Sequence, residues 1–274
     1  MLELHCHTTY SDGSLTPAEL VNAAAIAGIK AIAITDHDTI GGWEEAQKAA
    51  QPHDIEIIPG VELSTVYQGR SLHILGFYPN KNKFLAPLTE RLQGRKRRAS
   101  QILAKLAELG YCVQLPPRGE GMAPARPHIA TALMKAGYVQ STQEAFQRWL
   151  GEDKPAYVAY EKFSAVAGIQ LLRDCDAVPV WAHPYLFRGG GVETVLPILV
   201  EAGLMGIEVY HPSHSPTQIQ ALERLCMEYG LLKTGGSDYH GGRTSLNMFE
   251  LPLSLLDTIK QAAQIKTEFD PPSR

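Results

Sequence analysis

Two histidines near the N-terminus, His5 and His7, are the first residues whose types and spacing suit catalysis. They follow a short apolar stretch, and side chains at positions i and i+2 of an extended segment project from the same side of the backbone. The turn-rich stretch beyond them carries a carboxylate, Asp12. Imidazole and carboxylate groups that converge at a strand end suit a transition or divalent metal ion. Because such a pair also occurs by chance in polar loops, the interpretation depends on whether the pattern recurs.

The pattern does recur, because ligand-type residues follow or lie within most of the predicted strands. The motifs are Thr35-Asp36-His37-Asp38, Gly60-Val61-Glu62, the single His73, Ala182-His183-Pro184, His211-Pro212 and Gly236-Ser237-Asp238-Tyr239-His240. Polar residues at the carboxyl ends of strands are typical of active sites in α/β barrels and open α/β sheets. We therefore expect a metal site where several strand ends meet.

Seven apolar segments predict strands at residues 2–4, 31–34, 55–58, 71–78, 178–181, 206–210 and 231–233. Helices are predicted after most of these strands. The first helix begins with Thr16 as its N-cap, Pro17 as its first residue and Glu19 closing a capping box. An open doubly wound sheet fits this order, but a closed barrel brings all of its strand ends to one mouth. The sequence therefore favours a barrel of the α/β class.

Residues 81–162 interrupt the alternation of predicted strands and helices, because they contain leucines at helical spacing, from Leu85 to Leu109. We interpret them as an inserted helical subdomain that caps the site. Residues 1–80 and 163–274 would form the metal-binding barrel. The basic run Arg95-Lys96-Arg97-Arg98 inside the insertion is interpreted as a solvated helix face rather than as an RNA contact.

The composition limits the classes of function. The 274 residues carry a formal net charge of −4, so the composition does not indicate bulk attraction to nucleic acid and leaves open a local basic patch. No apolar segment approaches the ~20 residues of a membrane span, and the N-terminus lacks a signal-peptide pattern. The four cysteines have no CxxC spacing, which argues against a disulfide framework or a zinc ribbon. We predict a cytoplasmic protein without an obligatory protein partner.

Taken together, these motifs resemble those of the PHP (polymerase and histidinol phosphatase) family of metallophosphoesterases. They extend from one end of the chain to the other, and only the insertion lies outside the pattern. The resemblance implies a distorted (β/α)7 barrel with a site for two or three metal ions at its mouth. This expectation agrees with the seven predicted strands.

The resemblance also implies how the metal ligands are shared. One ion would be bound by His5, His7, Glu62 and Asp238, a second by His73 and His183 with Glu62 as a bridge, and a third by Asp12, His37 and His240. The nucleophile would be a metal-bridging hydroxide held by Glu62, together with Asp238, His183 and His37. Mixed nitrogen and oxygen ligands without cysteine favour Mn²⁺, with Fe or Zn²⁺ as alternatives.

Within the family, the insertion and its Arg126-Pro127-His128 segment resemble the freestanding branch of nucleoside 3′,5′-bisphosphate phosphatases. Arg126 and His128 are then expected to contact a substrate phosphate, because a helix start favours an anion. The implied reaction is hydrolysis of the 3′-phosphate of a nucleoside 3′,5′-bisphosphate. The alternatives are a 5′–3′ exoribonuclease on short 5′-phosphorylated RNA, a histidinol phosphate phosphatase and a non-catalytic module.

Three polar residues outside the ligand set are left with two interpretations each. Asp36 would either orient a ligand histidine or make an ordinary hydrogen bond at a strand end. One of His211 and His214 would either contact the substrate or make structural hydrogen bonds.

Overall fold

A computed structural model describes the chain except residues 117–118, 120–121, 160–162, 243–244, 247 and 270–274. Its centre is a seven-stranded sheet in which the strands are neighbours in chain order. The strands are β1 (Leu2–Glu3), β2 (Ala31–Ile34), β3 (Glu56–Tyr67), β4 (Arg70–Phe77), β5 (Val178–Trp181), β6 (Gly206–Tyr210) and β7 (Leu232–Gly235). The predicted barrel of seven strands is confirmed.

The barrel closes between the segments that follow β1 and β7. The backbone N–H of His7 donates to the carbonyl oxygen of Tyr239 (2.8 Å), and the N–H of Tyr239 donates to that of His5 (3.2 Å). Cys6 and Tyr239 thereby form a parallel bridge. Main-chain hydrogen bonds thus join the two ends of the chain that carry the densest ligand motifs.

Strands β3 and β4 differ from the expected pattern of parallel strands. The strand predicted at residues 55–58 continues to Tyr67, so Glu62 lies within β3 rather than beyond its end. A two-residue turn at Gln68 and Gly69 (φ 49° and 78°) then leads back into β4. Such a turn imposes antiparallel pairing. His73 therefore reaches the mouth from the first half of an antiparallel strand, not from a strand's carboxyl end.

Side chains alternate between the two faces of the sheet, and each face has its own apolar cluster. Ile32 and Ile34 of β2 face the cluster formed with the surrounding helices. Ala31 and Ala33 face the opposite cluster, which includes Leu256 of α9. Ile58 belongs to this second cluster, so Glu62, four residues further along β3, lies on the same face. The inner face is thus apolar at one end of the barrel and carries the ligand residues at the other.

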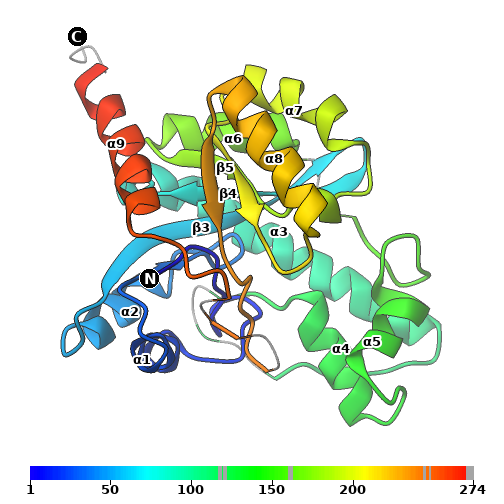
Figure 1. Cartoon of the computed structure of the whole chain (residues 1–274). Coiled ribbons are helices and arrows are strands. Elements are labelled where there is room, and N and C mark those ends of the chain that lie inside the picture. The colour runs from blue at the N-terminus through cyan, green and yellow to red at the C-terminus, as the bar shows by residue number, and fades with distance from the viewer. Residues whose placement is uncertain (117–118, 120–121, 160–162, 243–244, 247, 270–274) are drawn as a thin grey trace.

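Six helices of the described chain pack around the sheet (Figure 1). They are α1 (Pro17–Ile26), α2 (Trp43–Ala50), α6 (Ala165–Asp174), α7 (Val192–Glu201), α8 (Pro216–Tyr229) and α9 (Ser254–Phe269). The predicted capping box at the start of α1 is present. A 3-10 turn, η2 (Pro184–Leu186), follows β5. In the part of the chain that the structure describes, no helix has the length and apolar character needed to cross a membrane.

The insertion between β4 and β5 contains α3 (Lys81–Glu108), α4 (Arg126–Lys135), α5 (Thr142–Ala145) and a π-helical turn, η1 (Phe146–Leu150). The first half of α3 packs on the barrel core through Phe84 and Leu88. Its second half joins a separate apolar cluster whose buried members lie between residues 102 and 156. Figure 1 shows α4 and α5 at one side of the molecule, away from α7 and α8. The predicted boundary at residue 162 falls among the residues outside the description.

The basic run on α3 is not a solvated face, which corrects the expectation for two of its residues. Arg95 is buried and donates to Asp38 (Oδ2, 2.7 Å) and to Ser64 (Oγ, 2.9 Å). Arg98 is also buried and donates to the carbonyl of Val158 (2.7 Å). Only the intervening Lys96 and Arg97 are exposed. The helical period explains the split, because positions three apart share a face.

Replacing Arg95 by alanine is expected to lower the free energy of unfolding by roughly 3 kcal/mol. This lies at the low end for a broken buried ion pair, because Arg91 still contacts Asp38 (3.0 Å). The matched control is Arg97→Ala, whose partner Glu90 is exposed, with an expected loss below about 1 kcal/mol. Urea denaturation of both variants measures the difference. An equal loss of unfolding free energy in the two variants would contradict the stabilising role of the buried ion pair.

Candidate metal centre

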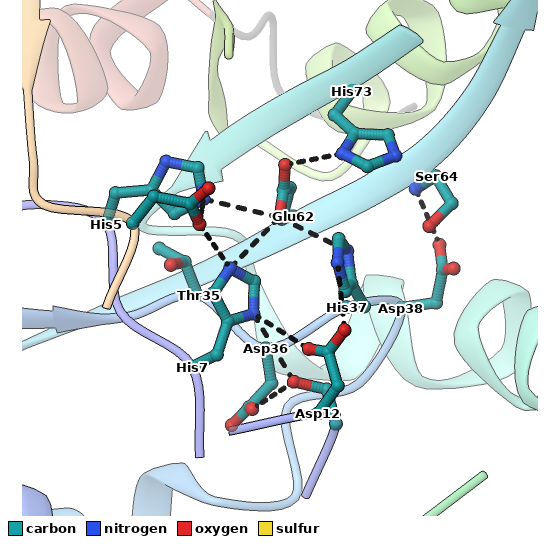
Figure 2. A network of polar contacts seen from close by, with 12 residues as sticks. His5, His7, Asp12, Thr35, Asp36, His37, Asp38, Glu62, Ser64 and His73 are labelled. Atoms are coloured by element: carbon teal, nitrogen blue, oxygen red, sulfur yellow. Dashed lines mark hydrogen bonds and ion pairs between the residues drawn. The ribbon is translucent and has the colours of Figure 1, made fainter. Parts of the chain in front are cut away.

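Glu62 is the centre of the site, because five histidine rings contact its buried carboxylate. His73 Nδ1 and His183 Nε2 lie 2.8 and 3.0 Å from Oε1. His5 Nε2, His7 Nε2 and His37 Nδ1 lie 3.1–3.2 Å from Oε2. Figure 2 shows Glu62 on the broad β3 ribbon, with the labelled rings of His5, His7, His37 and His73 around it. One carboxylate thus joins five histidines from four chain segments.

The ligand-type residues form three overlapping groups whose nitrogen and oxygen atoms lie within 4.8 Å of one another. The groups are His5, His7, Glu62 and Asp238; His37, Glu62 and His73; and His7, Asp12, His37 and His240. The first matches the set expected for one ion. The other two differ from the expected sets, because His37 contributes to both and His7 joins Asp12 and His240. His183 remains beside the second group through Glu62.

The chemistry of these atoms fits metal ions. Among the described residues, five buried ligand atoms form no hydrogen bond of normal geometry although ligand-type atoms lie close to them: His5 Nε2, His7 Nε2, His37 Nδ1, Asp12 Oδ1 and Asp238 Oδ1. Buried polar atoms without partners are costly, and a cation shared among them would remove that cost. Burial alone would raise the pKa of the Glu62 carboxyl, but His37, His73 and His5 outweigh it and hold that pKa well below its usual value. The glutamate is therefore ionised and available as a ligand.

The backbone is left-handed at three positions of this mouth, where residues other than glycine are uncommon. They are Asp38 (φ 50°), His183 (φ 33°) and Asp238 (φ 51°). Such conformations cost on the order of 1–3 kcal/mol each and cluster at functional sites. Here each one turns the chain at or next to a ligand-type residue.

Two buried glutamates that the sequence analysis missed support the histidines. Glu208, in the middle of β6, accepts from His5 Nδ1 (2.8 Å) and from the backbone N–H of His183 (2.7 Å). Glu3 of β1 accepts from the N–H of Ser237 (2.8 Å). Each glutamate stands between two apolar residues of its predicted strand, so the apolar pattern predicted the strand and not the role of the carboxylate. The usable signal was an acidic residue inside an otherwise apolar strand, which needs a buried partner.

The two aspartates beside His37 bind different parts of the chain. Asp36 accepts hydrogen bonds from the backbone N–H and hydroxyl of Thr8 (2.8 and 2.7 Å) and from the hydroxyl of Ser11 (2.5 Å). It therefore fixes the loop after His7. Asp38 faces the opposite way, toward Arg91 and Arg95 of the insertion. The segment around His37 is thus held on both sides.

The structure separates the two residues that were expected to contact a substrate phosphate. Arg126 lines a cavity of about 500 Å³ that also includes His73 and His183. His128 lines a different cavity beside Cys112, and its Nδ1 accepts from the backbone N–H of Ala125 (2.9 Å). His128 thus has a capping contact within its own helix.

The two histidines after β6 make contacts within the protein. His211 Nε2 lies 3.4 Å from Asp238 Oδ2, and its Nδ1 is 2.6 Å from the hydroxyl of Ser213. His214 Nδ1 donates to the carbonyl of Val209 (2.9 Å). His211 is therefore next to the metal-ligand groups, while His214 secures the turn.

Comparisons with known proteins agree with this geometry. A family model described as the PHP domain matches residues 3–150. The chain is 35% identical to a 5′-3′ exoribonuclease of Haemophilus influenzae, covering 87% of this chain and 89% of the relative. It is 32% identical to a 3′,5′-nucleoside bisphosphate phosphatase of Chromobacterium violaceum, covering 92% of each. A solved structure of a putative metal-dependent phosphoesterase from Bifidobacterium adolescentis superposes with a TM-score of 0.84 at 28% identity, covering 95% and 96% of the two chains.

Replacing Glu62 by alanine is expected to reduce the metal content to at most about one ion per chain, because two of the three ligand groups lose their carboxylate. Metal analysis by plasma mass spectrometry after gel filtration measures this, with two or three ions per chain expected for the wild type. Glu201→Ala, an exposed carboxylate at the end of α7, is the control and should retain the wild-type metal content. Full metal content in Glu62→Ala would contradict the proposed ligand role.

Replacing Glu208 by glutamine is expected to weaken metal binding by about 10- to 100-fold. The amide can accept only one of the two hydrogen bonds that the carboxylate now accepts from His5 and His183. Competition with a fluorescent chelator measures the affinity, and Glu193→Gln on exposed α7 surface is the control. Unchanged affinity would show that Glu208 does not orient the ligands.

Proposed function

Because the chain belongs to the PHP domain family and is a metal-dependent phosphoesterase, we propose that it hydrolyses the 3′-phosphate of nucleoside 3′,5′-bisphosphates. The products would be the nucleoside 5′-monophosphate and inorganic phosphate. In this reaction a bond forms between water oxygen and phosphorus, the bond from phosphorus to the 3′ oxygen breaks, and the leaving oxygen takes a proton.

The observation that carries the proposal is the cavity beside His73 and His183. Its volume of about 500 Å³ lies in the range of small-molecule sites and exceeds the needs of a phosphate group alone. Phe146 and Phe187 line it together with cationic residues. Aromatic surface suits a nucleobase, and cations suit its phosphates. A nucleotide matches both features better than histidinol phosphate, which has one phosphate and a small polar ring.

The residues that would hold the ions are the three groups around Glu62, and Mn²⁺ suits their mixture of imidazole and carboxylate. When bound, such ions lower the pKa of water and offset the charge of the phosphoryl oxygens. His5 and His7 are fully buried, whereas the side chains of His240, Asp238 and His73 are 34, 22 and 19% exposed. We infer that the phosphoryl group approaches from this exposed side. Arg126 would then bind the substrate from the cavity wall.

The second candidate is hydrolysis of phosphodiesters from the 5′ end of short RNA. The similarity to the exoribonuclease of Haemophilus influenzae, at 35% identity, favours it specifically. Both reactions attack a nucleotide phosphorus at the same ligand cluster. One active site can therefore accept both substrates, with the cavity deciding their relative rates.

Product analysis by chromatography tests the proposal. The Mn²⁺-loaded protein is given 3′,5′-adenosine bisphosphate, histidinol phosphate and a 5′-phosphorylated RNA pentamer in parallel. We expect release of phosphate and 5′-AMP from the bisphosphate, and a loss of at least about 100-fold in the His37→Ala blank.

Faster stepwise shortening of the pentamer would make the exoribonuclease reaction the main activity. Absence of product from all three substrates would contradict both candidates.

A further inference from the structure

We propose that Lys154 and Arg188 bind the second, non-reacting phosphate of the substrate. This inference rests on the proposed function, since it concerns the same cavity and the same substrate class. It assigns the preference for a bisphosphate substrate to two residues that lie outside the metal-ligand motifs of the barrel.

The cavity lies between the insertion and the barrel, and its cationic residues come from both. Lys154 follows η1 in the insertion, and Arg188 follows η2 on the barrel side. His73 and His183, which contact Glu62, line the same cavity. A ligand whose reacting phosphoryl group lies at these histidines therefore occupies the same cavity as Lys154 and Arg188.

The charged ends of these two side chains are available to a ligand. Both residues are exposed, and neither side chain forms an ion pair with any residue that the structure describes. Arg126 differs, because its guanidinium donates to the carbonyl of Leu150 (3.3 Å) and lies over the ring of Phe146 at 5.6 Å. In the described part of the chain, the charged groups of Lys154 and Arg188 thus differ from that of Arg126 in forming no ion pair and no hydrogen bond.

The residues that line the cavity carry little negative charge to balance Lys154 and Arg188. Glu152 is the one carboxylate among the described lining residues. Its oxygens accept from the backbone N–H of Ser71 (3.2 Å) and lie 3.5 Å from Arg70 Nη1, so its charge already has partners outside the lining cations. The cavity therefore carries an excess of positive charge next to a centre that would already hold cations. A ligand with a single phosphate, taken up by that centre, would leave these charges unbalanced.

A second phosphate in the same molecule supplies the missing charge. Phosphate oxygens accept strong charge-assisted hydrogen bonds from both guanidinium and ammonium groups. Each such contact changes affinity by roughly tenfold or more. The expected consequence is a preference for a bisphosphate over the corresponding 3′-monophosphate.

The experiment compares kcat/KM for 3′,5′-adenosine bisphosphate with kcat/KM for 3′-AMP. In the wild type we expect a ratio well above one. In the double variant Lys154→Ala/Arg188→Ala the ratio should fall about 100-fold, with each single variant accounting for about tenfold. Arg188→Lys, which keeps the charge, should retain most of the ratio. Lys96→Ala, an exposed cation on α3 away from the cavity, is the matched control and should keep the wild-type ratio.

The outcomes separate this inference from the proposed function. A wild-type protein that releases phosphate from neither compound overturns the proposed function. A wild type that hydrolyses both compounds equally well, or a double variant that keeps the wild-type ratio, overturns the role of Lys154 and Arg188 while leaving the phosphatase intact.

Discussion

The structure depends on a fully buried glutamate, Glu62, whose two oxygens contact five histidines. Neutral imidazoles cannot balance a buried carboxylate, so the cluster needs cations, either metal ions or protons. Without ions, burial lowers the pKa of His7, but contacts with Asp238 and Glu62 prevail and raise it to about 10. Protons and metal ions therefore compete for the same atoms. Because the five histidines come from four separate segments of the chain, the centre assembles only when the barrel closes.

Further buried carboxylates surround this centre, and each one fixes a different part of the chain. Glu208 orients His5, which follows β1, and the backbone of His183, which follows β5. Asp36 holds the loop after His7. Asp38, the residue next to His37, pairs with Arg91 and Arg95 of α3. The first half of α3 is thereby connected to the segment of His37 through one ion-pair network.

The fold class, the number of strands and the set of clustered ligand-type residues could be predicted from the sequence, because the motifs are local and recur at strand ends. Contacts between distant segments could not. Arg95 resembles a surface cation until Asp38, 57 residues away, is known to lie beside it. The antiparallel β4 was missed because Gln68-Gly69 is a weaker turn signal than Asn-Gly or Asp-Gly. Glu208 was missed because hydrophobic periodicity does not identify the partner of a single buried charge.

The separate apolar cluster of the insertion has a consequence for how this protein can diverge. Backbone hydrogen bonds anchor both ends of the insertion to the barrel, from Asn80 to Cys175 (2.7 Å) and from Val66 to Phe163 (2.9 Å). Between these anchors, the cluster packs mainly on itself. Mutations there can reshape one wall of the cavity without moving a histidine of the centre. New substrates can thus evolve in one half of the molecule while the chemistry is conserved in the other.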